Sequence, residues 1–310
     1  MSDALNDVLD FANKLRTSNK PANTKLKVDP YFYEIPEIAK ILEYAMSERP
    51  TKNVLIVGPT GCGKSSLAIN VMARLSKEAE IFSCDGETST DNLIGKLIAR
   101  PNEKGDPTTE VVLGAALRAY KTGKGLLLEE VDIASPEVLA SLHRIMENHS
   151  GHYICNIGAE DVIDKNPDFF VIGTANTIGT GEDTFLYAGT KPLNQAFMNR
   201  FSITVEMDYL GAMLELKVVT DKTGINRDLA EGLISIANDV RNASNPTRIG
   251  GMPGSQKLVS TISTRDLLEW AQLISRMNLS VMDAAKYAFL NRASVVDRDI
   301  IKEFITNKGL

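Results

Sequence analysis

The stretch NVLIVGPTGCGKSSLAINVMARL, residues 53–75, decides the fold of this chain. Its first part, NVLIV, predicts a buried strand, and the part after the glycines predicts a helix. Between them GPTGCGKS, residues 58–65, matches the pattern GxxxxGK(S/T) in full. Such glycines let backbone N–H groups turn toward phosphate oxygens, while Lys64 neutralises phosphate charge and the Ser65 hydroxyl can hold Mg²⁺. The stretch therefore predicts a phosphate-binding loop.

The expected nucleotide-binding residues form one continuous segment at this loop. They are Gly58, Pro59, Thr60, Gly61, Cys62, Gly63, Lys64, Ser65 and Ser66. The alternative is a glycine-rich turn that binds nothing, which would require the motif and both of its flanks to be accidental.

A second stretch, LLLEEVD at residues 126–132, runs from apolar residues directly into carboxylates. Carboxylates at the edge of a core are costly unless a cation or another partner meets them. In open α/β sheets ligands gather at the carboxyl ends of strands, so we expect Glu129 beside the metal and Glu130 as the base that polarises water. We expect Asp132 to brace the turn into the next helix. In isolation the stretch would favour a solvated acidic turn, and the upstream loop reverses that preference.

Around these stretches, apolar runs alternate with helical patterns. We predict strands at 53–57, 80–84, 125–130, 168–176 and 201–207, and helices at 64–76, 91–98, 135–148 and 191–200. Short apolar strands separated by helices indicate a parallel sheet covered on both faces. The fold class is therefore α/β.

The pattern changes along the chain and predicts three segments. Residues 1–45 indicate an N-terminal helical segment and linker, residues 46–208 the α/β core, and residues 209–310 a helical domain in which the β-type runs stop.

The bulk composition narrows the class of partner and the compartment. The formal net charge is −6 and no dense basic run is present, so nucleic acid is not expected as a partner. The three cysteines are far apart and form no CxxC pair, which fits a reducing cytoplasm. Neither an export signal nor a membrane span is expected.

Five motifs occur in the order of an AAA+ ATPase. GPTGCGKS, LLLEEVD, GTANT (173–177), MNRF (198–201) and STRD (263–266) resemble its Walker A, Walker B, sensor 1, arginine finger and sensor 2. The chain is most similar to MoxR-type AAA+ proteins, and among these to the CobS-like ATPase subunits of cobaltochelatase. That narrower resemblance rests on DNLIGKLIA (91–99), EVDIASPEVLASLHRIME (130–147) and TANTIGTGEDTFLYAGTKPLNQAFMNRFSITVEMDYL (174–210).

The resemblance implies a fold and three further site residues. The fold would be an AAA+ P-loop NTPase core with hairpin inserts near 100–112 and 150–168, followed by a C-terminal helical lid. Asn176 would position the attacking water, Arg200 would reach the γ-phosphate of the neighbouring subunit, and Arg265 would report nucleotide state from the lid. The ordinary alternatives are a strand-end amide, a surface arginine and a helix-start arginine.

The function implied is Mg²⁺-dependent ATP hydrolysis in a homo-oligomeric ring, expected to be hexameric, that remodels or activates a partner protein. Relatives imply a partner with a von Willebrand factor A domain, and a narrower role as the ATPase of a cobalt or magnesium chelatase. The family usually has Asp where this chain has Glu129. That departure motivates the alternative of a nucleotide-dependent scaffold with weak hydrolysis.

Overall fold

A computed structural model describes most of the chain: residues 51–75, 77–85, 88–101, 106–147, 151–154, 162–177, 193–244 and 258–310, with Leu26, Lys40, Ile41 and Tyr44. Contacts between Cα atoms divide it into two compact units, and along the chain the main division falls between Glu206 and Met207. We call the first the core unit and the second the helical unit. Residues 59–63 cluster with the helical unit.

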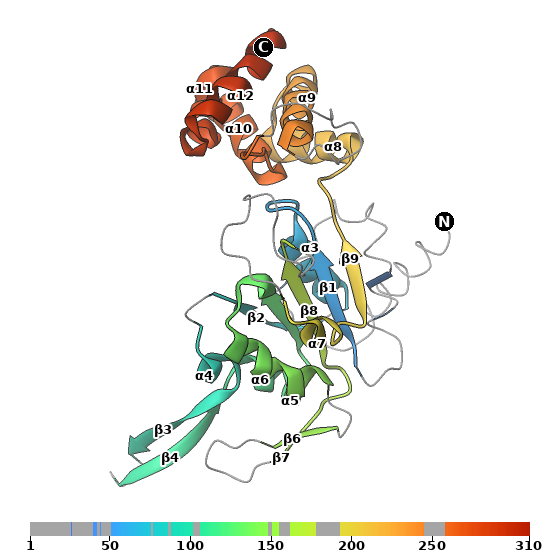
Figure 1. Cartoon of the computed structure of the whole chain (residues 1–310), viewed down its shortest axis with the longest axis vertical. Helices are drawn as coiled ribbons and strands as arrows, with labels where there is room; N and C mark the ends of the chain where they lie inside the picture. Colours follow the sequence, from blue (N-terminus) through green and yellow to red (C-terminus); the bar gives the residue numbers. More distant parts are fainter. Residues whose placement is uncertain are drawn as a thin grey trace. The chain divides into compact units, whose positions relative to one another are not determined.

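The core unit is built on a five-stranded parallel sheet with the order β2-β5-β8-β1-β9 (Figure 1). Its strands are β1 (Asn53–Val57), β2 (Ala79–Ser83), β5 (Gly125–Glu129), β8 (Phe170–Ala175) and β9 (Ile203–Glu206). The register pairs Val57 with Ala175 and Ser83 with Glu129. Because all the pairings are parallel, the five carboxyl ends lie at one edge. The predicted α/β fold with a parallel sheet is confirmed.

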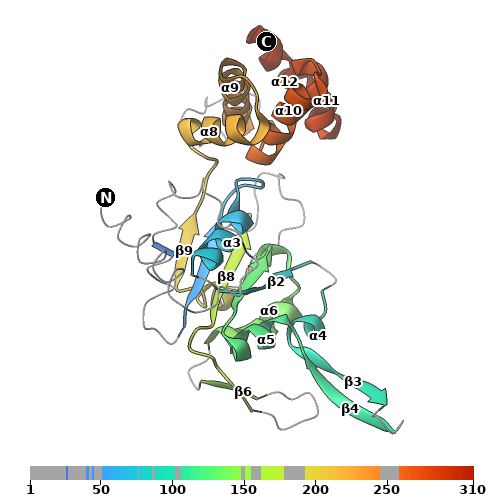
Figure 2. The same ribbon diagram turned by 180° about the vertical axis from the view of Figure 1, so that it is seen from behind.

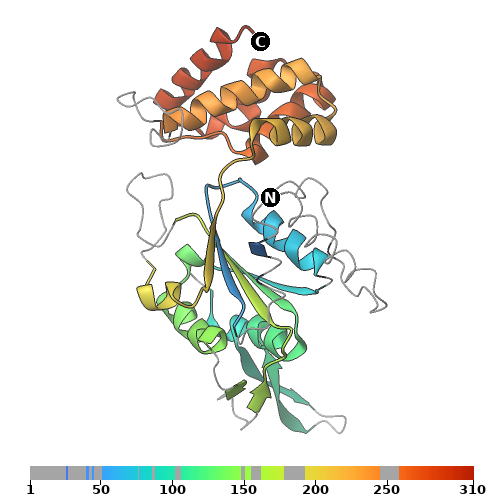
Figure 3. The ribbon, with the colours of Figure 1, turned by 90° about the vertical axis from the view of Figure 1, so that its right-hand side faces the viewer.

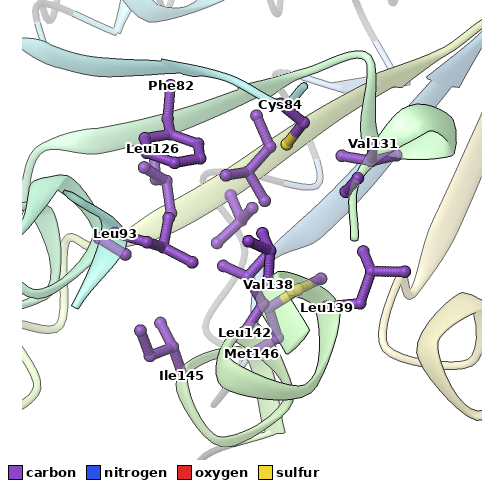
Figure 4. Close-up of a cluster of buried hydrophobic side chains, with 14 of the residues drawn as sticks. Phe82, Cys84, Leu93, Leu126, Val131, Val138, Leu139, Leu142, Ile145 and Met146 are labelled. Carbon is purple, nitrogen blue, oxygen red and sulfur yellow. The ribbon is translucent and has the colours of Figure 1, made fainter. Parts of the chain in front are cut away.

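Helices cover the sheet because its strands are apolar on both faces. The main ones are α3 (Lys64–Arg74), α5 (Ala115–Thr122) and α6 (Pro136–Glu147). Leu126 and Leu128 belong to a buried cluster with residues of α5 and α6, part of which Figure 4 shows. Side chains alternate along a strand, and Gly125, in phase with Leu127, lies against Met72 of α3. The sheet is thus a packed middle layer.

The prediction of a helix at 91–98 is wrong. A four-residue helix, α4 (Thr90–Leu93), is followed by a hairpin of β3 (Gly95–Pro101) and β4 (Pro107–Leu113). Gly95 has a φ of +132°, and a Cβ there would lie 2.4 Å from the Val112 carbonyl oxygen. A helix cannot pass through such a residue. The hairpin extends away from the sheet (Figure 2).

A second hairpin and a missed helix complete the core unit. Strands β6 (His152–Ile154) and β7 (Val162–Asp164) pair antiparallel near the second predicted insert. Helix α5 was not predicted. It ends at Gly123, whose φ of +77° is the left-handed conformation typical of a helix C-terminus.

The described elements of the helical unit are all helices (Figure 3). They are α8 (Ala212–Thr223), α9 (Arg227–Ser244), α10 (Thr264–Met277), α11 (Val281–Ala288) and α12 (Val295–Asn307), with a short turn at Leu290–Arg292. Trp270 is fully buried among them and donates to the Val281 carbonyl oxygen at 2.9 Å. The predicted helical C-terminal region is confirmed.

Several predictions fall on residues that the structure does not describe. Most of the N-terminal segment 1–45 is among them, although Ile41 and Tyr44 are helical and buried. Residues 155–161 of the second insert and 178–192 after the GTANT motif also lie outside the described part. Among the described helices, none has the length and apolarity needed to cross a membrane.

Candidate nucleotide-binding site

The phosphate-binding loop joins β1 to α3, as its strand and helix flanks predict. Gly61 and Gly63 have φ angles of +73° and +104°, which side-chain-bearing residues adopt only with strain. Such a backbone can turn its N–H groups toward one centre at the N-terminus of an 11-residue helix. Cys62 is buried within the loop, Ser65 is half-buried and Ser66 is exposed.

Lys64 is the first residue of α3, and its side chain is held at the edge of the sheet. Its Nζ donates to the Gly58 carbonyl oxygen at 2.7 Å and to Asn176 Oδ1 at 2.9 Å. Asn176 follows β8, so the structure brings together the ends of two neighbouring strands. The Gly58 N–H donates to the Ala175 carbonyl oxygen at 3.2 Å and extends their pairing. Lys64 and Asn176, the predicted sensor residue, therefore contact each other at this edge of the sheet.

The two glutamates stand at the end of β5, with β8 between them and the loop. Two strand spacings of about 4.8 Å separate these ends by roughly 10 Å, which leaves room for phosphates. Glu129 is partly buried, and its Oε2 accepts from Ser83 Oγ at 2.8 Å. Glu130 is exposed and has φ 56° and ψ 47°. Left-handed backbone at a glutamate is strained, and such strain clusters at functional sites.

Asp132 is expected to brace the turn into α6, but its side-chain hydrogen bonds among the described residues go to the segment after β8. It is fully buried, and its Oδ2 accepts from the backbone N–H groups of Asn176 at 2.8 Å and Thr177 at 3.1 Å. Ser135 instead caps α6 by accepting from the Val138 N–H at 3.3 Å. The third carboxylate of the motif thus holds the segment that contains Asn176 and Thr177.

These residues fit a nucleotide with Mg²⁺. The loop offers backbone donors and a lysine for phosphate, while Ser65 and Glu129 supply the oxygen ligands that Mg²⁺ prefers. Glu129 would hold the metal side and Lys64 the phosphate side. Among the described residues, this site included, no group of three or more His, Cys, Asp or Glu is placed to hold a metal ion, so a bound Mg²⁺ would depend on Ser65, Glu129 and the nucleotide phosphates together.

Arg200 lies at the opposite edge of the sheet. Its carbonyl oxygen accepts from Asn53 Nδ2 at 2.8 Å, and Asn53 begins β1 whereas the loop follows its end. The length of β1, about 13 Å at 3.3 Å per step, separates the two. The Arg200 guanidinium pairs with Glu147 at 2.7 Å. The structure therefore does not bring Arg200 to the loop of its own chain.

Arg265 is the second residue of α10, in the helical unit. Ser263 and Asp266 form a capping box there: the Ser263 side chain accepts from the Asp266 N–H and the Asp266 side chain accepts from the Ser263 N–H. The start of the helix that carries Arg265 is thus defined, and its role as a nucleotide sensor stays a prediction.

Sequence reasoning missed the residues that position this site. Thr174 accepts from the Glu130 N–H at 3.2 Å, Ser83 orients Glu129, and Glu147 binds Arg200. Thr174 stands within the GTANT motif, which could have marked it. Ser83 and Glu147 occupy ordinary strand-end and helix-end positions that carry no signal.

Comparisons with known proteins identify the family of the chain. A family model described as "AAA domain (dynein-related subfamily)" matches residues 53–201, and one described as "CbbQ/NirQ/NorQ C-terminal" matches residues 215–305. The chain is 30% identical over 253 residues to "Aerobic cobaltochelatase subunit CobS" of a Sinorhizobium species, covering 81% of this chain and 74% of that protein. The chain belongs to the MoxR-type, CobS-like AAA+ ATPases.

Other similar proteins add little about activity. An uncharacterized protein of Staphylococcus haemolyticus is 27% identical to this AAA+ protein over 227 residues, 73% of this chain and 79% of that one. A solved structure of a RuvB mutant from Thermotoga maritima matches with a TM-score of 0.48 and 16% identity, covering 82% of this chain and 70% of that one. At that TM-score we draw nothing from the likeness.

Proposed function

We propose that this AAA+ protein hydrolyses ATP with Mg²⁺ and, as a ring oligomer, uses that reaction to remodel or activate a partner protein. One observation carries the proposal. Lys64 is held by Gly58 and Asn176 at the same sheet edge where Glu129 and Glu130 end β5. A cation for phosphate, an amide for water and two carboxylates are the groups that ATP hydrolysis needs.

Each residue has one task in the proposed reaction. Glu130 accepts the proton of the attacking water, and the Asn176 amide orients that water. Lys64 neutralises negative charge on the terminal phosphate. Bound Mg²⁺, held by Ser65 and Glu129, would supply Lewis-acid stabilisation of that charge.

The proposal of a ring rests on the position of Arg200. Its distance from the loop of its own chain leaves it no task there, whereas an arginine offered to a neighbouring subunit stabilises the developing phosphate charge. The expected symmetry is cyclic, with each Arg200 completing the next site, because a head-to-tail interface whose rotation closes forms a ring. Six subunits is the number typical of the family that the sequence resembles.

The decisive experiment compares Glu130→Gln with Glu137→Gln, a matched control on the exposed first turn of α6. We expect Glu130→Gln to lower steady-state phosphate release by about 10²-fold or more. Binding of a fluorescent ATP analogue should stay within about threefold, since a base contributes little to ground-state binding. Unchanged turnover in Glu130→Gln would remove the base assignment. Absent turnover in the wild-type chain, with nucleotide bound, would instead favour the scaffold with weak hydrolysis.

A second candidate is the ATPase subunit of a cobalt or magnesium chelatase. It is favoured by the relative whose name is aerobic cobaltochelatase subunit, matched over 81% of this chain. Capture of partners by Glu130→Gln with ATP separates the two, because that variant should hold the nucleotide-bound assembly. A captured chelatase subunit would support this candidate. A von Willebrand factor A protein without chelatase partners would support general remodelling, and no stable partner at all would contradict both.

A further inference from the structure

Asp132 is a buried carboxylate without a cationic partner among the described residues. It lies in the single turn Val131–Ile133 after β5, and no part of it is exposed. Burial of a carboxylate is costly unless hydrogen bonds compensate. Its recorded donors are the N–H groups of Asn176 and Thr177, at 2.8 and 3.1 Å, and Thr177 Oγ1 at 3.4 Å. Every donor belongs to the segment directly after β8.

That segment lies beyond the end of the β5–β8 ladder. The recorded pairs stop at Leu128 with Gly173, and one side-chain bond, from the Glu130 N–H to Thr174 Oγ1, continues the contact. Asp132 then fixes the next two residues. Asn176 in turn accepts from Lys64 at 2.9 Å. A continuous series of bonds therefore runs from the turn that holds Glu130, through Asp132 and Asn176, to the phosphate-binding lysine.

We propose that Asp132 is a positioning residue for ATP hydrolysis, which sets the place of the Asn176 amide relative to Glu130. It touches neither substrate nor metal in this role and acts through the backbone of Asn176. The inference rests on the proposed function, because the value of a fixed Asn176 depends on hydrolysis. A displaced orienting group costs rate more than affinity, since it acts on the attacking water.

Two substitutions at Asp132 separate positioning from simple stability. Asp132→Asn keeps an oxygen that can accept both N–H bonds, and its NH₂ group takes the place of Oδ1, which has no hydrogen-bond partner among the described residues. Asp132→Ala removes the acceptor. Leu117→Ala changes a fully buried apolar residue of α5 in the core cluster and serves as a control for destabilisation by loss of packing.

Three measurements are made on the full chain: phosphate release with its kcat and KM, the midpoint of thermal unfolding, and amide hydrogen exchange of the peptide containing residues 174–177. We expect Asp132→Ala to lower kcat by about 10- to 100-fold with KM changed less than about threefold. Exchange at Asn176 and Thr177 should rise. Asp132→Asn should keep both kcat and the amide exchange of this segment near the wild-type values. Leu117→Ala should lower the midpoint of thermal unfolding and leave kcat of the folded protein unchanged.

The inference is overturned if Asp132→Asn is as slow as Asp132→Ala, or if Leu117→Ala loses kcat to the same extent. It is also overturned if exchange at Asn176 does not respond to Asp132→Ala. This last readout needs no turnover. If the wild-type chain does not hydrolyse ATP, the proposed function fails independently of Asp132. In that case, faster amide exchange in Asp132→Ala would show only a structural contact, and the positioning role would be overturned.

Discussion

The buried ion pair of Glu215 and Arg241 offers the sharpest stability prediction for the helical unit. Both side chains are fully buried, and Arg241 Nη1 and Nη2 donate to the two Glu215 oxygens at 2.8 and 2.9 Å. Arg241 Nε donates to the Ile262 carbonyl oxygen at 2.7 Å, and its guanidinium carbon lies 4.1 Å from the centroid of the Tyr209 ring. Thr264 Oγ1 donates to Glu215 at 2.7 Å. The pair therefore joins α8, α9 and the start of α10.

Glu215→Gln removes one charge at nearly constant shape and leaves the Arg241 guanidinium buried without its counter-charge. Loss of one partner of a buried pair costs about 3–5 kcal/mol. Against a typical unfolding free energy of about 5–15 kcal/mol this is a large fraction. For a unit of roughly 100 residues, each kcal/mol lost lowers the midpoint of thermal unfolding by about 4–8 °C. Glu215→Gln should therefore lower that midpoint by at least about 12 °C.

Circular dichroism and calorimetry measure the midpoint of thermal unfolding. We expect the transition of the helical unit to shift to lower temperature. The matched control is Glu231→Gln, whose ion pair with Arg227 joins side chains 53% and 75% exposed. An exposed pair of this kind contributes about 0.5 kcal/mol or less. A midpoint change below about 3 °C in Glu215→Gln, or an equal change in both variants, would refute the assignment of the pair as a buried support.

Two further predictions concern the far edge of the core sheet. The Arg200 and Glu147 side chains are 26% and 41% exposed, so their ion pair should contribute about 1 kcal/mol at most to stability. We therefore expect Glu147→Gln to change the rate of phosphate release by less than about fivefold. Arg200→Ala should lower that rate by about 10³-fold, because it removes the arginine proposed to act on the neighbouring site. Burial, with Arg200 nearby, lowers the pKa of His143 below 6.5, so the unfolded chain binds more protons there. The free energy of unfolding should therefore fall as pH drops below 6.5. Urea titrations at pH 7.5 and 5.5 measure this difference in free energy, which should be smaller in His143→Gln. A difference that His143→Gln leaves unchanged would contradict the pKa shift.

The loop and the sheet could be predicted because their signals are local. The strand, glycine turn and helix of residues 53–75 are adjacent in the sequence, and each part has its own residue pattern. The helix predicted at 91–98 failed for the opposite reason. Its apolar residues fit a helix, but Gly95 turns the chain into a hairpin whose second strand, ending at Leu113, lies outside the local window. Tertiary pairing overrode local preference.

The positioning bonds of the site could not be predicted from spacing. Asp132 and Asn176 are 44 residues apart, and only the neighbouring positions of β5 and β8 in the sheet bring them together. The sequence indicates that both residues follow buried strands, but it does not indicate strand order. A carboxylate after a strand is therefore visible as a candidate, whereas the backbone N–H groups that it binds are not.

The same sheet order bears on Glu129, which stands where the resemblance to the family implies aspartate. The extra methylene lengthens the side chain, and in this chain the additional reach ends in a partner: Ser83, paired in register on the neighbouring strand, donates to Oε2. That bond occupies one carboxylate oxygen and restrains a flexible side chain, so Oε1 is the oxygen that we expect to face a bound metal. A hydroxyl that donates to a metal-binding carboxylate orients that carboxylate. Ser83, at the end of β2, is therefore the residue that we expect to hold the longer Glu129 side chain in place for its proposed role beside the metal.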